Sequence, residues 1–296
     1  MIQRLSDNKK MPFSVLLSLY EKENPSFLTD SLNSIYDQTL PADEVVLVED
    51  GPLTPELYAI LNKFKTERSN FRTIKLEKNS GLGVALNEGL KHCSFDIVAR
   101  MDTDDIAKKT RFEKQIKFLI DNPDIDVVGS WVDEFTDDNK NVKTIRKVPQ
   151  SSTEIFEYCK SRCPVNHPTV VFRKSAVLKV GGYLTQYFPE DYFLWIKMLM
   201  NNSHFFNIQE SLLYFRKSKD TIKKRGGWKY AWDEIHIQKM IYDIGFINKP
   251  TYLRNCSIRF FVRIIPLSLR KFIYRNFLRK NAKTLNNKRC LRCNIQ

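Results

Sequence analysis

The sequence has no hydrophobic run long enough to cross a bilayer as a helix. The apolar stretch nearest the N-terminus, Phe13–Leu19, is only as long as a strand, whereas a spanning helix needs about 18–20 apolar residues. The polar segment Met1–Lys10 has none of the features of a signal peptide. The six cysteines form no disulfide framework, and Cys290 and Cys293 supply only half of a zinc-binding pattern. We therefore expect a cytoplasmic protein in a reducing compartment.

Acidic residues are missing from the C-terminal end, where none follows Asp243. Residues 214–296 contain 21 Lys/Arg and 4 Asp/Glu, a net charge of +17, whereas residues 1–213 contain 27 and 30, a net charge of −3. The overall charge of +14 is thus carried by the tail. A basic tail on a weakly acidic body indicates a polyanionic partner. The chain has no nucleic-acid-binding motif, so we expect an anionic membrane surface rather than nucleic acid.

Strand-like and helix-like segments alternate through the first half of the chain. The pattern predicts helices between the strands, including one with Thr54 as its N-cap and another over Gly81–His92. Such alternation predicts a mostly parallel, three-layer α/β sheet, which 42% apolar residues can support with a buried core. The predicted strands are Phe13–Leu19, Glu44–Val48, Phe71–Leu76 and Phe95–Met101.

Each of these four strands is followed by a polar loop. In open α/β sheets, ligands bind beyond the carboxyl ends of the strands, so we expect the four loops to meet at one binding site. The loops are Tyr20-Glu21, Glu49-Asp50-Gly51, Asn79-Ser80-Gly81 and Asp102-Thr103-Asp104-Asp105.

The last of these loops places three carboxylates within four residues. Each pair of carboxylates about 4 Å apart repels by roughly 1 kcal/mol in water and more inside a protein. A divalent cation would remove that repulsion, and oxygen ligands suit Mg²⁺ or Mn²⁺. The alternative is that Asp104 or Asp105 caps a following helix, which would account for only one of the three residues.

Three motifs together resemble family-2 glycosyltransferases of the GT-A fold over roughly residues 12–215. The resemblance departs at Leu86, where many relatives carry Arg, and Arg100 beside the acidic run is expected to compensate in part. The motifs are Val45-Val46-Leu47-Val48-Glu49-Asp50-Gly51, Asn79-Ser80-Gly81-Leu82-Gly83-Val84-Ala85-Leu86-Asn87-Glu88-Gly89 and Arg100-Met101-Asp102-Thr103-Asp104-Asp105.

The resemblance implies roles for individual residues in binding a uridine-diphosphate sugar. It implies that Asp102 and Asp104 form the DxD element that binds ribose, metal and diphosphate, with Asp105 in support. The remaining expected nucleotide-binding residues are Tyr20, Glu21, Asp50, Asn79, Gly81, Gly83 and Arg100.

A second acidic site is needed, because inverting transfer requires a base to take the proton of the acceptor hydroxyl. The resemblance implies that Glu190 and Asp191 form this site, with Asp191 as the base. The alternative is an ordinary helix N-terminus, where acidic residues are favoured by the helix dipole. His167 is a further candidate for contact with acceptor or diphosphate, although a lone histidine is more often structural.

The tail predicts where such an enzyme works. Ile258–Arg279 interleaves aromatic and basic residues around Pro266, which predicts interfacial helices on an anionic bilayer, placing the protein on the cytoplasmic face of the inner membrane. The alternative is a core-packing helix with a solvated basic face. The chain is similar to bacterial enzymes that transfer glucose or galactose, with a β-linkage, to an N-acetylhexosamine on undecaprenyl diphosphate during O-antigen or capsule synthesis.

We accordingly expect a catalytic domain over residues 1–215, with residues 12–122 binding the nucleotide sugar and 123–215 the acceptor, and a basic helical region over 216–296. Three rival functions stay open at this point. One is a glycosyltransferase acting on another cell-surface polysaccharide or glycolipid. The second is a nucleotidyltransferase, which the acidic loop Tyr20-Glu21-Lys22-Glu23 disfavours. The third is a non-catalytic nucleotide-binding membrane adaptor.

Overall fold

Four parallel strands form the first half of the central sheet. In the computed structural model, which describes residues 11–136, 139, 141–186, 189–217, 227–266 and 280–281, β1 lies between β2 and β4. All six residues of β2 are buried, as expected for a strand covered on both faces. The predicted strands and their parallel order are confirmed. They are β1 (Phe13–Leu19), β2 (Glu44–Glu49), β3 (Phe71–Lys75) and β4 (Ile97–Arg100).

Beyond β4 the sheet becomes mixed. β8 (Val171–Arg173) pairs antiparallel with β4 and with β6 (Ile125–Phe135), and β6 runs parallel to β9 (His204–Arg216). The short strands β5 (Ile106–Ala107), β7 (Thr144–Arg146) and β10 (Lys280–Asn281) complete it. β9 follows β6 over nearly its whole length.

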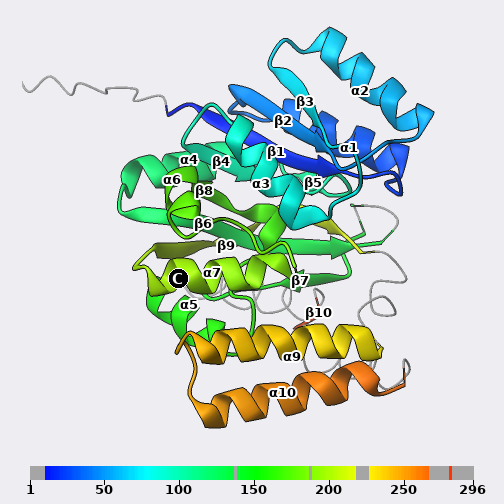
Figure 1. The fold of residues 1–296 in the computed structure, drawn as a ribbon. Helices are drawn as coiled ribbons and strands as arrows, with labels where there is room; N and C mark the ends of the chain where they lie inside the picture. The colour runs from blue at the N-terminus through cyan, green and yellow to red at the C-terminus, as the bar shows by residue number, and fades with distance from the viewer. Residues whose placement is uncertain are drawn as a thin grey trace, which may run out of the picture.

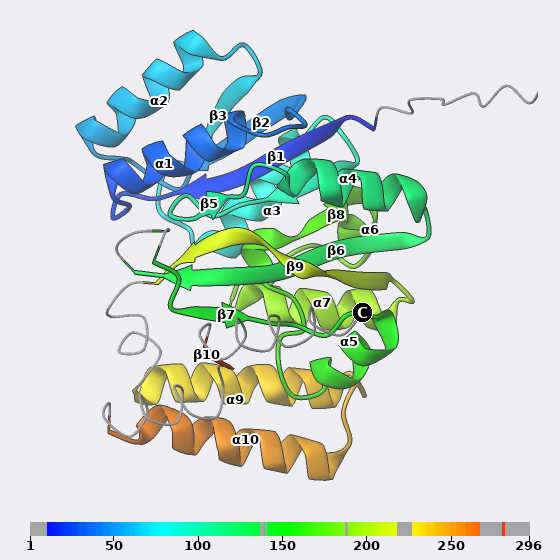
Figure 2. The same ribbon diagram turned by 180° about the vertical axis from the view of Figure 1, so that it is seen from behind.

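Helices cover both faces of the sheet and make three layers (Figures 1 and 2). Each face has its own hydrophobic cluster, so the buried strands of the sheet separate two cores. One face carries α1 (Pro25–Tyr36), α2 (Pro55–Glu67) and α4 (Arg111–Asp121). The other carries α3 (Leu82–His92), α5 (Ser152–Cys159), α6 (Lys174–Lys179) and α7 (Glu190–Met200).

A hairpin of two helices, α9 (Trp228–Asp243) and α10 (Lys249–Ile264), packs below α5 and α7 (Figure 1). Lys249-Pro250 predicts a linker, but this prediction is wrong, because these residues form the first turn of α10. Proline suits the first turn of a helix, and Asn248 caps it by accepting the N–H of Thr251. The helix ends before Pro266, which keeps the preceding residue extended.

The predicted tail helix Ile258–Arg279 is thus observed over its first seven residues, whereas residues 267–279, Cys290 and Cys293 lie outside the described residues.

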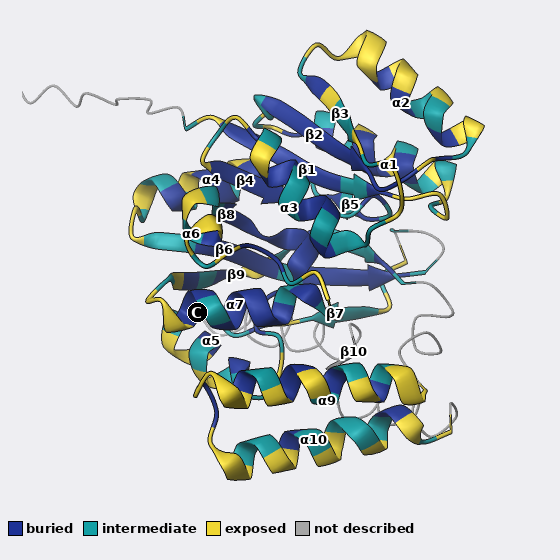
Figure 3. Ribbon diagram, viewed as in Figure 1, coloured by how far each residue is buried: buried dark blue, intermediate teal, exposed yellow. Residues whose placement is uncertain are grey.

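Helix α10 buries two polar side chains and exposes several apolar ones. Asn255 and Arg263 are buried, whereas Ile258 and Phe261 are more than half exposed. Figure 3 shows buried, intermediate and exposed positions along α10. Of the expected alternative, a core-packing helix with a solvated basic face, α10 shows the packing against α9 and the exposed Lys249 and Arg254, but Arg263 is buried. The inward basic groups and the outward apolar groups each need an explanation.

Gly89 gives a test of the packing between α3 and the sheet. A Cβ at this position would lie 2.4 Å from Leu16 Cδ1 and 2.8 Å from Val48 Cγ2. We expect Gly89→Val to lower the free energy of unfolding by about 2–3 kcal/mol through overpacking, measured by urea denaturation. Lys91→Ala, on the exposed side of the same helix, should change it by less than about 0.5 kcal/mol. Equal effects of the two substitutions would contradict this account of α3.

Candidate active site

The three carboxylates of the acidic run lie together directly after β4. One oxygen each from Asp102, Asp104 and Asp105 falls within 4.8 Å of the others. The run leads into β5 and not into a helix, and the next helix begins at Arg111 with Thr110 as its N-cap. The alternative that one of these residues caps a following helix is therefore wrong.

The surroundings of the cluster disfavour its negative charge when no cation is bound. Burial, followed by repulsion from Asp102 and Glu23, raises the pKa of Asp104 to about 7. The pKa of Asp105 is raised well above its usual value, again by burial first. Asp105 Oδ1 accepts the N–H of Arg216 at 2.8 Å, but its buried Oδ2 has no hydrogen-bond partner among the described residues. Crowded hard oxygens with an orphaned buried lone pair fit a divalent cation.

Arg100 supplies a buried positive charge beside this cluster. Its side chain is 1% exposed and forms an ion pair with Asp102. Burial alone would lower the pKa of Arg100, but attraction to Asp102 and other acidic groups outweighs burial and raises it. Leu86, where the sequence departs from the family pattern, is fully buried in the hydrophobic core on the α3 side of the sheet.

The second acidic site forms the first turn of α7. Burial, then repulsion from Asp191, raises the pKa of Glu190 to about 7, and burial also raises the pKa of Asp191. The thiol of Cys163 donates to Asp191 Oδ2 at 3.5 Å. A helix N-terminus favours ionised carboxylates, so the raised pKa values show that burial dominates here.

A cavity of about 350 Å³ joins the two acidic sites. Residues predicted from distant parts of the sequence line it together, namely Arg100, Asp102, His167, Glu190 and Asp191. The sites are thus parts of one pocket at the carboxyl end of β4.

His167 lies in this wall with its ring enclosed. Its Nε2 lies 3.1 Å from the hydroxyl of Tyr183, and the ring packs edge-on against Trp195. Burial, and then the charge of Arg100, lowers the pKa of His167 well below its usual value. The imidazole is therefore neutral near pH 7, and its contact with acceptor or diphosphate stays a prediction.

The predicted nucleotide-binding loops converge on the same rim. Asp50 accepts the backbone N–H groups of Ser80 and Gly81 at 2.7 and 3.1 Å, so this carboxylate fixes the loop before α3. Gly81 has a φ of 91°, which favours glycine. At Gly83 a Cβ would lie 2.2 Å from the carbonyl oxygen of Leu184, so the chain itself requires this glycine.

Of the remaining residues of these loops, Tyr20 lies close enough to the acidic cluster for the charge of Asp104 to act on it. Tyr20, after β1, is 39% exposed, and its pKa is raised by burial and then by Glu23 and Asp104. Glu21 and Asn79 are exposed. Contact of these loops with a nucleotide remains a prediction.

Two residues of the site were missed from the sequence. Glu23 accepts a hydrogen bond from Thr103 Oγ1 at 3.1 Å, and burial raises its pKa. Arg216, at the end of β9, donates from Nε to the carbonyl oxygen of Asp104 at 2.8 Å. Glu23 stood in the acidic loop after the first strand. No short sequence motif marks Arg216, because its partner in the cluster, Asp104, lies 112 residues earlier in the chain.

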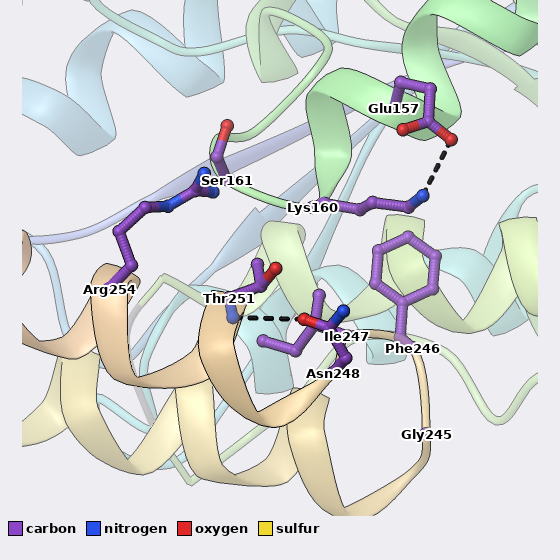
Figure 4. A pocket seen from close by; sticks show the side chains of 9 residues that line it. All are labelled: Glu157, Lys160, Ser161, Gly245, Phe246, Ile247, Asn248, Thr251 and Arg254. Carbon is purple, nitrogen blue, oxygen red and sulfur yellow. Dashed lines mark hydrogen bonds and ion pairs between the residues drawn. The ribbon is translucent and has the colours of Figure 1, made fainter.

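A larger cavity of about 690 Å³ lies elsewhere, between the end of α5 and the start of α10 (Figure 4). Its lining includes Lys160 and Arg254 but none of the predicted site residues. In the close-up Lys160 is engaged by an ion pair with Glu157, at 2.7 Å. Volume alone therefore does not identify the site; the converging carboxylates do.

Within the described residues, no helix is both long and apolar enough to cross a membrane.

The chain is 42% identical to the UDP-Gal:alpha-D-GlcNAc-diphosphoundecaprenol beta-1,3-galactosyltransferase of Escherichia coli, over 90% of this chain and 97% of that one.

Solved structures share the fold at lower identity. TarS 1–349 of S. aureus in complex with UDP-GlcNAc gives a TM-score of 0.62 at 20% identity, over 86% of this chain and 72% of that one, and this chain spans 43% of a longer TarS chain. The mannosyltransferase PcManGT of Pyrobaculum calidifontis, in complex with GDP-Man and Mn2+, gives 0.60 at 15%, over 86% and 70%.

These structures confirm the predicted GT-A fold. The family model for glycosyl transferase family 2 matches residues 14–181. With that match and a relative 42% identical over nearly its whole length, the chain belongs to glycosyl transferase family 2.

Proposed function

We propose that this protein transfers a hexose, glucose or galactose, from a UDP-sugar to an N-acetylhexosamine carried on a lipid diphosphate, with inversion to a β-linkage. The observation that carries the proposal is the single cavity lined by both Asp102 and Asp191. The name of the E. coli relative supports the donor and the acceptor. The product would be a repeat unit of O-antigen or capsule, made at the cytoplasmic face of the inner membrane.

The donor side of the reaction would belong to the acidic run. Asp102, Asp104 and Asp105 would hold a divalent cation, Mn²⁺ or Mg²⁺, and the Mn²⁺ in the PcManGT complex supports this choice. When bound, such a cation neutralises the charge that develops on the departing diphosphate. Arg100 would hold the Asp102 carboxylate in its orientation through their ion pair.

The acceptor side would belong to Asp191. Its carboxylate would take the proton of the attacking hydroxyl as the new bond to the anomeric carbon forms and the bond to the diphosphate breaks. A base works best when its pKa lies near the working pH, and burial moves Asp191 in that direction. Glu190, whose pKa burial raises to about 7, would carry a proton of its own next to Asp191.

Replacement of Asp191 tests the assignment of the base. We expect Asp191→Asn to lower kcat for sugar transfer by roughly 10²–10⁴-fold, the usual contribution of a general base, with little change in KM for the donor. Because the base acts only when deprotonated, wild-type kcat should rise with pH, and the rise should lie above the usual titration range of an aspartate. Transfer would be measured as UDP release and as glycosylated acceptor. Unchanged turnover would refute the role of Asp191; Asp124→Asn, whose side chain is 70% exposed, is the matched control.

Metal dependence can be tested through stability as well as activity. The folded state holds the Asp104 proton more tightly than the unfolded state does, so without metal this residue lowers stability as pH rises from about 4 to about 7. At pH 8, saturating Mn²⁺ or Mg²⁺ should stabilise the protein by about 2–3 kcal/mol at a hundredfold excess over Kd. The gain should fade as pH drops below about 7, since protons compete with the cation.

Asp104→Asn should raise the melting temperature of the metal-free protein at pH 8 and abolish its response to metal. Both would be followed by thermal unfolding with and without EDTA. The exposed Asp37→Asn, 73% exposed in its side chain, should leave both properties unchanged. A metal response that survives in Asp104→Asn, together with full activity in EDTA, would refute metal dependence.

Membrane association would use the outer face of the α9–α10 hairpin. Apart from Tyr20, Leu178 and Met200, every exposed large hydrophobic residue described lies between Trp228 and Ile264. We call this set the hairpin patch; it comprises Trp228, Trp232, Tyr242, Ile244, Leu253, Ile258, Phe261 and Ile264. Exposed Lys229, Lys249 and Arg254 lie on the same two helices. Tryptophan beside basic residues suits an anionic membrane interface.

Vesicle binding tests the hairpin patch without disturbing the core. We expect Trp232→Ala/Phe261→Ala to weaken binding to phosphatidylglycerol-containing vesicles at least about tenfold, because each large side chain contributes roughly 1.5–3 kcal/mol when buried. Sedimentation with vesicles measures this. Leu178→Ala/Met200→Ala removes two exposed hydrophobic residues elsewhere and should leave binding unchanged. Equal binding of all three proteins would refute the membrane role of the patch.

A further inference from the structure

Two arginines of α10 reach the cavity that holds the predicted base. Arg259 and Arg263 line it together with Glu190 and Asp191, although they lie almost seventy residues later in the chain. The guanidinium of Arg259 lies 5.5 Å from the ring centre of Tyr192, the residue next to Asp191. The C-terminal hairpin is therefore part of the wall of the active-site cavity.

One carboxylate serves both arginines. Glu234 of α9, 3% exposed, accepts from Arg263 Nε and Nη2 at 2.9 and 2.8 Å. It also accepts from Arg259 Nη1 at 3.1 Å, while Arg259 Nη2 donates to the carbonyl oxygen of Ser161 at 2.8 Å. These contacts fix both guanidinium groups in direction, and a guanidinium remains charged at any physiological pH.

Stability does not require this arrangement. A buried ion pair seldom stabilises more than apolar side chains of similar volume, and α10 leaves such side chains, Ile258 and Phe261, facing outward. The helix thus covers the charges of Arg259 and Arg263, at a cost in desolvation, while Ile258 and Phe261 stay exposed. A ligand that carries negative charge into the cavity would offset that cost.

The donor diphosphate is not the expected ligand of these arginines. The basic residues in contact with the acidic run are Arg100, paired with Asp102, and Arg216, bonded to the carbonyl oxygen of Asp104, whereas Arg259 contacts Tyr192 on the base-bearing helix. The arginines therefore lie on the acceptor side. Two further basic residues, Arg146 and Lys147 of the segment around β7, line the same cavity.

We propose that Arg259 and Arg263 bind the diphosphate of the acceptor while its sugar hydroxyl reaches Asp191. The proposal rests on the function proposed above and identifies the residues that recognise the acceptor's anionic part. Arginine suits this role because its planar fork matches phosphate oxygens in pairs. The enzyme would thereby select sugars on a diphosphate over free sugars or simple glycosides.

The test compares two soluble acceptors that carry the same alkyl chain. In one, N-acetylglucosamine is joined to the chain through a diphosphate; in the other, it is joined directly. We expect the wild type to have the lower KM for the diphosphate acceptor. Arg259→Gln and Arg263→Gln should each raise that KM about ten- to a hundredfold. They should leave the KM for the direct glycoside and for the UDP-sugar within about twofold, and Arg259→Lys should restore part of the loss.

Arg254→Gln is the matched control, since it removes the same charge from the same helix but lines the larger cavity of Figure 4. Arg254→Gln should leave the KM for the diphosphate acceptor and the KM for the direct glycoside unchanged. Melting temperatures of all variants identify any that fail to fold, in which case Arg259→Lys carries the test.

Three results would overturn the proposal. The first is equal KM values of the wild type for both acceptors. The second is a proportional loss on both acceptors in the glutamine variants, which would show a structural role. The third is weaker vesicle binding with unchanged acceptor KM, which would assign the arginines to membrane phosphates. If the wild type releases no UDP, whether either acceptor is present or no acceptor is added, the function proposed above is refuted instead.

Discussion

The buried guanidinium of Arg100 lies among carboxylates that come from both halves of the fold. It forms an ion pair with Asp102, and its charge also acts on Asp104, Asp105, Glu190 and Asp191. Each of these groups would be costly to bury without a neighbouring cation. Arg100 is therefore the central positive charge of the cavity, and it lowers the cost of burying the two acidic sites in one pocket.

The position of Arg100 is fixed by the ordinary packing of the sheet. Arg100 ends β4, whose four residues are all buried, and its backbone N–H bonds the carbonyl oxygen of Val170 in front of β8. Parallel strands on one side and antiparallel β8 on the other fix this residue at the rim. The geometry of the site thus follows from strand order, as general principles of α/β sheets lead one to expect.

Local patterns in the sequence predicted much of this structure, and the failures share one cause. The first four strands, the acidic run and the helix beginning at Glu190 each have a signal confined to a short segment. Arg216 and Arg259 do not, because partners from over 95 residues away bring them to their places. The orientation of α10 was not predictable either, since composition shows that a helix is basic and aromatic but not which side faces the body.

Asn87 ties together the two parts of the domain that were expected to act on donor and acceptor. From α3 its side chain donates to the carbonyl oxygen of Tyr183 at 2.9 Å and accepts the N–H of the same residue at 2.8 Å. Gly182 comes so close that a Cβ there would lie 2.4 Å from Asn87 Oδ1. Recombination between relatives at the midpoint of the domain would separate these partners. An exchange of residues 123–215 between family members would therefore have to preserve the contacts of Tyr183 and Gly182 with Asn87 of α3.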